Sequence, residues 1–133
     1  MGAMRIFRSA TAGVNPVDPN TFVGPATMQR LAESDEAVPV GVYRVAFADG
    51  GRTNWHTHSG PQWLFVVEGR IRVQRQGEPA QDLVAGDAVV FSPNEKHWHG
   101  AVPGYAGTHL AVNVDVVTTW LEAVSEAEYV AEA

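Results

Sequence analysis

The stretch WHTHSGPQ, residues 55–62, gathers side chains that can bind a metal ion. Two of the chain's 5 histidines, His56 and His58, stand one residue apart in it, and Gln62 follows shortly after. Side chains alternate faces along a β-strand, so a strand would put both imidazoles on one face and Trp55 on the other. Neutral imidazole is the commonest protein ligand for borderline divalent metals, and an amide oxygen can add a further donor.

A second cluster, SPNEKHWHG at residues 92–100, repeats this spacing with His97 and His99. The remaining histidine, His109, lies in the later segment GTHLAVNVD. Three β segments that meet in one barrel would bring all the imidazoles together. His97 could then complete a set of four donors with His56, His58 and Gln62, leaving positions open on the ion, as in catalytic sites.

The plainer interpretation is that these histidines are only hydrogen-bonded within the core. A single His-x-His pair is weak evidence for a metal, and a glutamine that opens a strand is often solvated. Two such pairs with a polar residue between them favour the metal site. Three neutral imidazoles and a neutral amide would leave the charge of a divalent ion uncompensated, so the site should attract anions and act as a strong Lewis acid.

The elements that must position these side chains are short β-strands. Glycine and proline recur every eight to twelve residues through the middle of the chain, between segments rich in valine, isoleucine, aromatic residues and threonine. This pattern is typical of an all-β sandwich or barrel. The expected strands are residues 22–31, 40–47, 53–58, 62–67, 71–75, 82–83, 88–91, 97–102 and 108–114. Turns are expected at Gly50-Gly51, Glu68-Gly69, Gln76-Gly77 and Ala85-Gly86-Asp87, because glycine tolerates positive φ.

The tail of the chain changes character. Residues 120–124 have the composition of a short helical turn. The sequence SEAE that follows matches a capping box, in which Ser125 accepts from the backbone amide of Glu128 and the Glu128 carboxylate reaches back. We therefore expect a short C-terminal helix.

The outer face of the strand that begins at Gln62 is apolar. If Gln62 faces inward, then Trp63, Phe65 and Val67 face outward. Such large apolar groups need to be covered. A homodimer whose sheets pack together and a second sheet of the same chain both satisfy this requirement.

Bulk properties limit the function. The length of 133 residues favours one domain, residues 1–133, and the absence of cysteine excludes disulfides and thiolate chemistry. A net charge of −6 argues against nucleic acid, so the expected partners are a small-molecule substrate and another copy of the chain. No membrane-spanning segment or signal peptide is apparent, which predicts a cytoplasmic protein. Residues 1–3 could be a cloning remnant before a natural start at Met4.

These motifs resemble those of the cupin family of small β-barrels. The first cupin motif is matched by Gly50, His56, His58, Gln62 and Gly69, with Gln62 in place of the usual glutamate. The second is matched by Gly86 and His97, although Ser92 and Asn94 replace the usual proline and glycine. The resemblance implies a single jelly-roll-like antiparallel barrel over about residues 38–115.

The stretches WHTH, AGD, FSPNEKHWHG and THLAV are similar to those of manganese-binding cupins that include hydroxynitrile lyases and cupins associated with carboxymuconolactone decarboxylases. That resemblance implies His56, His58, Gln62 and His97 as the metal ligands, with His109 in the pocket and His99 beside it. Manganese is the metal expected first, with iron, nickel or zinc as alternatives.

Three functions are compatible with such a site. The first is a lyase in which His109 or His99 acts as general base. The second is an O₂-dependent dioxygenase or oxidase at the same metal. The third is a non-enzymatic cupin that binds a small ligand. The lyase is favoured because the more specific resemblance is to a cupin group that includes hydroxynitrile lyases.

Overall fold

The computed structural model describes residues 3–133, so most of the suspected cloning remnant lies outside it. The chain is almost entirely β-structure, as expected. Its strands are β1 (Val14–Pro16), β2 (Phe22–Val23), β3 (Ala26–Ser34), β4 (Val40–Phe47), β5 (Arg52–Thr53), β6 (His56–His58), β7 (Gln62–Arg75), β8 (Gln81–Val84), β9 (Ala88–Phe91), β10 (His97–Ala101), β11 (Gly107–Val114) and β12 (Thr118–Trp120). A 3₁₀ turn, Ser9–Thr11, precedes them, and one helix, α1 (Glu126–Val130), follows them.

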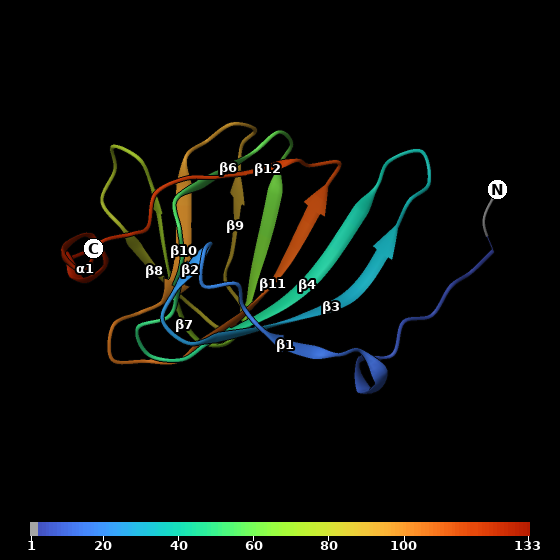
Figure 1. The fold of residues 1–133 in the computed structure, drawn as a ribbon, viewed down its shortest axis with the longest axis horizontal. Coiled ribbons are helices and arrows are strands. Elements are labelled where there is room, and N and C mark those ends of the chain that lie inside the picture. Colours follow the sequence, from blue (N-terminus) through green and yellow to red (C-terminus); the bar gives the residue numbers. More distant parts are fainter. Residues whose placement is uncertain (1–2) are drawn as a thin grey trace.

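The strands form one curled antiparallel sheet in the order β1-β3-β4-β11-β7-β10-β5-β2. The short strands β8 and β9 pair with β7, while β6 pairs with β10 and with β12. Figure 1 shows that this sheet is curled, so that it has a concave side, the hollow of the fold, and that the two described ends of the chain lie on opposite sides of the molecule. The fold is thus a curled, all-β antiparallel sheet with a short C-terminal helix, in agreement with the barrel that the sequence predicts.

Strand β7 runs through the position where a turn was expected. Gly69 has φ +64° yet lies within the continuous strand Gln62–Arg75, so the prediction of a turn at Glu68-Gly69 is wrong. A Cβ built at Gly69 would lie 2.1 Å from the carbonyl oxygen of Ala106. Glycine is required here because the backbones of two strands approach closely at a left-handed residue. Strand β7 therefore continues past Gly69, so that it pairs with β11 and β9 and also with β10 and β8.

Two other expected strands are each split. Residues 22–31 contain a break at Gly24-Pro25, and residues 53–58 contain a break at Asn54-Trp55. Proline has no N–H to donate, and Gly24 adopts φ +74°, so the ladder stops there. At the second break the backbone amides turn to other partners, since Trp55 N donates to the carbonyl of Glu122 at 2.9 Å.

The C-terminal segment confirms one expectation and corrects another. The capping box is present, with Glu128 N donating to Ser125 Oγ at 3.1 Å and Ser125 N donating to Glu128 Oε1 at 2.9 Å. Residues 120–124 are not helical, because Trp120 ends β12 and the next amide donates to the carbonyl of Trp55. Among the described residues, no helix has the length and apolar character to cross a membrane.

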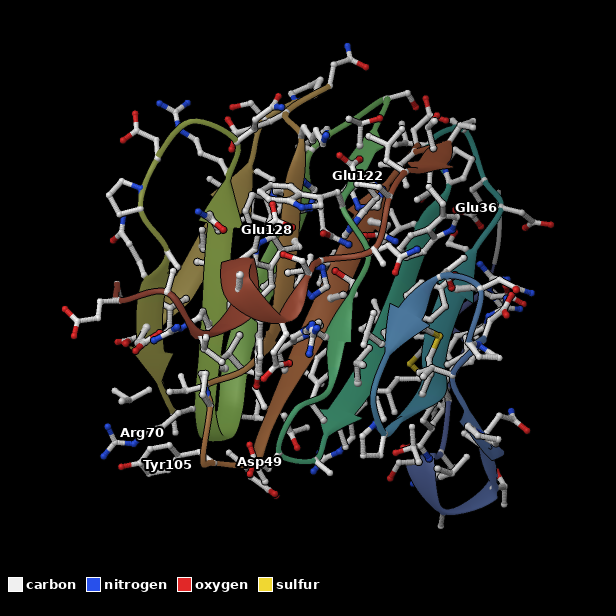
Figure 2. All side chains as sticks on the ribbon, turned by 60° about the vertical axis from the view of Figure 1, so that its left-hand side comes forward. Glu36, Asp49, Arg70, Tyr105, Glu122 and Glu128 are labelled. Carbon is white, nitrogen blue, oxygen red and sulfur yellow. The ribbon has the colours of Figure 1, made fainter. Side chains whose placement is uncertain are left out.

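The C-terminal segment covers part of the outer face of the sheet. Trp55 and Trp98 point away from the hollow, as the alternation predicts, and pack with Val124 and Tyr129 in a cluster of their own. Trp98 is fully buried. Figure 2 shows α1, which carries Glu128, lying across the sheet at this place. For these two tryptophans the cover comes from the same chain.

Arg72 links the C-terminal segment to the sheet. Its buried guanidinium pairs with Asp82 at 2.8 Å and donates to the carbonyl oxygens of Tyr129 and Ala131 at 2.9 and 2.7 Å. Because Arg72→Ala would leave these acceptors without their donor, we expect the free energy of unfolding to fall by about 2–3 kcal/mol in urea titrations. Arg70→Ala, at the exposed rim beside Tyr105 in Figure 2, should change it by less than about 0.5 kcal/mol. Equal losses in both variants would contradict this role of Arg72.

Candidate metal and substrate site

The histidines project into the hollow of the curled sheet. His56 and His58 lie on β6, His97 and His99 on β10, and His109 on β11. All are buried, with exposed fractions between 0% and 4%. The predicted alternation is therefore confirmed for both His-x-His pairs.

Strand pairing brings the two histidine clusters into contact. His97 lies directly opposite His56 in the β10–β6 ladder, and their ring centroids are 4.3 Å apart. Nitrogen atoms of His56, His97 and His99 all lie within 4.8 Å of one another, the distance expected of groups that could hold one metal ion. This triad differs from the expected ligand set, since it contains His99 and not His58.

His58 and Gln62 border the same cluster. The rings of His58 and His56 have centroids 4.9 Å apart, and those of His58 and His97 are 5.4 Å apart. Gln62 opens β7, and its Oε1 lies 3.2 Å from Nε2 of His97. The four residues expected to bind the metal thus lie together, with His99 beside them.

The Nδ1 atoms of three histidines are occupied, and this fixes their rings. His56 Nδ1 donates to the carbonyl of Asn54 at 2.8 Å, and His97 Nδ1 donates to that of Glu95 at 2.7 Å. His58 Nδ1 lies 2.8 Å from the hydroxyl of Thr118. Because a donating Nδ1 leaves Nε2 as a lone pair, Nε2 of His56 and of His97 is available as a ligand.

The contact between His97 and Gln62 suits a cation. Gln62 Nε2 donates to Asn113 Oδ1 at 2.8 Å, so its Oε1 faces His97. Nε2 of His97 carries a lone pair as well, which leaves two acceptors 3.2 Å apart with no proton between them. Nε2 of His58 is buried and also has no hydrogen-bond partner. Buried polar atoms normally have partners, and a divalent cation coordinated by these atoms would provide one. The residues therefore fit a metal ion.

His99 and His109 form a second unit of the site. Nε2 of His109 and Nδ1 of His99 are 2.9 Å apart and share a hydrogen bond. Nε2 of His99 and Nδ1 of His109 are buried without a partner. A register shift between Thr108 and His109 in the β11–β7 ladder accompanies the inward placement of His109. The pair thus leaves one unoccupied nitrogen on each ring.

Burial keeps all five imidazoles neutral at pH 7. Loss of solvation lowers the pKa of His97 to about 4 and that of His109 to about 3. The pKa values of His56 and His99 lie well below the ordinary value, because of burial and then of neighbouring imidazoles. Burial also lowers the pKa of His58, although the Gln62 amide opposes the change. Neutral imidazole is the form that binds a metal or accepts a proton.

These shifts predict that acid destabilises the metal-free fold. Below the ordinary pKa of about 6.5 the unfolded chain takes up protons on histidines that the folded chain keeps neutral. Their contribution to stability is complete above that pH and is lost as the pH falls towards the folded values, about 4 for His97 and about 3 for His109. Each should cost about 1.4 kcal/mol per pH unit in that window. The Tm of EDTA-treated protein should fall steadily from pH 7 to pH 5, and a flat profile would contradict the shifts.

A cavity of about 310 Å³ opens onto this cluster. Its polar lining includes His56, His58, Gln62, His99 and His109. Tyr43, Val45 and Asn113 also line the cavity. Phe47, Leu64 and Phe91 instead belong to the buried core, where Phe91 stacks on the His97 ring with centroids 3.7 Å apart.

Comparison with known proteins agrees with this architecture. The family described as "Cupin domain" matches residues 43–108. The chain is 38% identical over 124 residues to the (R)-mandelonitrile lyase of Granulicella tundricola, covering 91% of this chain and 93% of that protein. The chain belongs to the cupin family.

Solved structures share the fold. A cupin-like protein of Thermotoga maritima superposes with a TM-score of 0.80 at 36% identity, covering 95% of both chains. The polyketide cyclase RemF of Streptomyces resistomycificus superposes with a TM-score of 0.73 at 19% identity, covering 96% of this chain and 91% of that one. The second likeness shows the fold alone.

Three site residues of this cupin escaped the sequence motifs. The Thr118 hydroxyl contacts Nδ1 of His58, and the Trp120 ring lies tilted against the His56 ring, with the centroids 4.7 Å apart. Both belong to β12, a strand that the sequence did not predict. Arg30 also lines the cavity, and the inward parity of β3 at Ala26, Met28 and Arg30 is the signal that could have found it.

Proposed function

We propose that this cupin is a metal-dependent lyase that cleaves cyanohydrins into an aldehyde and hydrogen cyanide, or runs the reverse reaction. The 38% identity to a mandelonitrile lyase over nearly the whole chain carries the proposal. The neutral donors His56, His58, Gln62 and His97 are proposed to hold the metal, with manganese as the first candidate. Iron, nickel and zinc are the alternatives.

In this proposal His99 is the general base. When Nδ1 of His99 is the donor in its 2.9 Å hydrogen bond with Nε2 of His109, Nε2 of His99 is left as a lone pair with no protein partner. Both rings line the cavity that also exposes His56, His58 and Gln62. A substrate bound there would have its reacting atoms between the base and the metal donors. His109 then orients the base and stabilises its protonated form.

The reaction needs one proton transfer and one bond cleavage. His99 Nε2 takes the hydroxyl proton of the cyanohydrin, the carbon–nitrile bond breaks, and its electron pair leaves with the cyanide. The protonated His99 then returns the proton to cyanide, which yields hydrogen cyanide and the aldehyde. A divalent cation bound by the four donors would supply positive charge that stabilises the developing anion.

The test is formation of benzaldehyde from mandelonitrile by purified protein supplied with manganese. Matched samples are treated with EDTA, reloaded with zinc, or assayed without oxygen. Lyase chemistry predicts activity that disappears with EDTA, survives without oxygen and partly returns with zinc. Strict dependence on oxygen and on a redox-active metal would favour an oxidase or dioxygenase. Tight substrate binding without turnover would favour a binding protein, and either result would overturn the proposal.

We also propose that the protein is a homodimer joined through the exposed face of β7 and β9. Trp63, Phe65 and Val90 are 43%, 41% and 44% exposed there, and Trp63 pairs with Val90 across the two strands. Because a contiguous apolar face rarely remains in solvent, a second copy of the chain suits it. Changing Trp63 and Phe65 together to glutamate should halve the mass in sedimentation equilibrium. Val84→Glu, on β8, should not change it. A monomeric parent protein would contradict the proposal.

A further inference from the structure

The cavity differs sharply in charge from the rest of the protein. The chain carries 15 acidic residues against 9 basic ones. Within residues 3–133, no acidic side chain lines the cavity, and Arg30 is the one lysine or arginine that does. Arg30 is therefore the one permanently charged side chain in the described lining of the cavity.

Strand register places Arg30 on the same inner surface as the site. Arg30 lies opposite Tyr43 on β4, and Tyr43 lies opposite Ala111 on β11. One row further into the barrel, Met28 lies opposite Val45, which in turn lies opposite His109. Paired strands lie about 4.8 Å apart, so Arg30 is separated from the His109 strand by about two strand spacings. That separation suits the two ends of one small molecule.

The interactions of Arg30 with other described residues are weak. Within the described part of the chain its one ion pair is with Glu33 at 3.2 Å, and the two side chains are 59% and 60% exposed. Such exposed pairs contribute little and exchange readily. The guanidinium carbon lies 5.7 Å from the centroid of the Tyr43 ring, which holds it at the mouth of the cavity. Little free energy is therefore lost when the Arg30 guanidinium leaves Glu33 to bind a ligand.

We infer that the cavity takes a substrate that carries a carboxylate, which Arg30 binds at the mouth while the reacting carbon lies beside His99. The inference rests on the proposed function in placing the reaction there. A lone planar guanidinium matches a carboxylate with two parallel hydrogen bonds. The remaining lining includes Phe22, Met28 and Trp120, which suit an aromatic or short aliphatic body.

The test compares 4-formylbenzoate with its methyl ester, because the ester keeps the aldehyde and the ring but replaces the charged carboxylate with a neutral group. Binding is measured by calorimetry on the manganese-loaded parent, on Arg30→Leu and on Arg44→Leu. Arg44 is a matched control, because it lies on β4 and pairs with Glu68 without lining the cavity. The parent and Arg44→Leu should bind the carboxylate about fivefold more tightly than the ester. Arg30→Leu should show no preference, and Arg30→Lys should keep part of it.

Acetate separates binding at Arg30 from binding at the metal, because it is too short to occupy both places. Its affinity should be equal in the parent and in Arg30→Leu. A parent without preference, or an equal preference in Arg30→Leu, would overturn the inference even where mandelonitrile is cleaved. Conversely, an Arg30-dependent preference without cleavage of any cyanohydrin would overturn the proposed lyase and leave carboxylate recognition standing. Far-ultraviolet circular dichroism checks that each variant is folded.

Discussion

His58→Ala is expected to lose its metal, whereas His99→Ala is expected to keep it. Two ligand sets are geometrically close in this site. One contains His56, His58, Gln62 and His97, and the other is the compact triad of His56, His97 and His99. His99 shares its Nδ1 with His109, and Nε2 of His58 and Nε2 of His99 are both buried with no partner. In the proposed site a cation satisfies the His58 nitrogen, and the His99 nitrogen is left free to act as the base.

The expected change is large because loss of a direct ligand should exceed the 10- to 100-fold cost of losing an outer contact. We therefore expect His58→Ala to bind manganese more than about 100-fold more weakly in calorimetric titrations, and to retain little metal in elemental analysis. His99→Ala should bind within about tenfold of the parent. Thr57→Ala, whose side chain alternates to the other face of β6, is the control. The reverse order, with metal lost from His99→Ala and kept in His58→Ala, would assign the compact triad as the metal site.

The alternation of β-strands made the core of the site predictable. A period of two fixes which side chains share a face, so it followed from spacing alone that His56 faces the same side as His58 and His97 the same side as His99. The same rule placed Trp98 outside the hollow, where it is indeed buried beneath the C-terminal segment. These predictions needed only local sequence, because the face of a strand residue is a local property.

Features that depend on partners distant in the chain were not predictable. Trp120 was expected in a helical turn, yet its segment pairs with β6 and places Thr118 on His58. The pairing partner decided the structure, since β12 completes its hydrogen bonds with a strand about sixty residues earlier. Gly69 was expected to end a strand, because the sequence shows its conformational freedom and not the close neighbour at Ala106.

The sequence could not decide the set of metal ligands for the same reason. Spacing indicates which imidazoles share a face, but three of the rings are oriented by groups on other segments or on neighbouring loops. Asn113 sets the orientation of the Gln62 amide from β11, and Thr118 contacts His58 from β12. No local pattern marks either residue. Their positions follow only from the register of the assembled sheet.

The second large effect concerns His99 as the base. In the proposed reaction the His99→Ala variant keeps the metal but has no lone pair to accept the hydroxyl proton. General acid–base catalysis contributes about 10²- to 10⁴-fold, so kcat for mandelonitrile should fall by that factor with little change in KM. His109→Ala should lose less, because the proposed role of His109 is to orient His99 through the 2.9 Å hydrogen bond.

The rate must be read together with metal content, because a metal-free variant would be inactive for another reason. Turnover is therefore expressed per bound manganese ion and measured from pH 8 down to well below pH 6.5, because burial lowers the pKa of His99 well below that ordinary value. Loss of the base should remove the pH dependence that protonation of His99 imposes on kcat/KM, whereas a merely structural defect would leave its shape unchanged. Exogenous imidazole offers a further distinction, since it can enter the space vacated by the ring and restore part of the rate. If His99→Ala turns over mandelonitrile as fast as the parent at equal metal content, the proton goes elsewhere, and His109, whose Nδ1 is also buried and unpartnered, becomes the base to test.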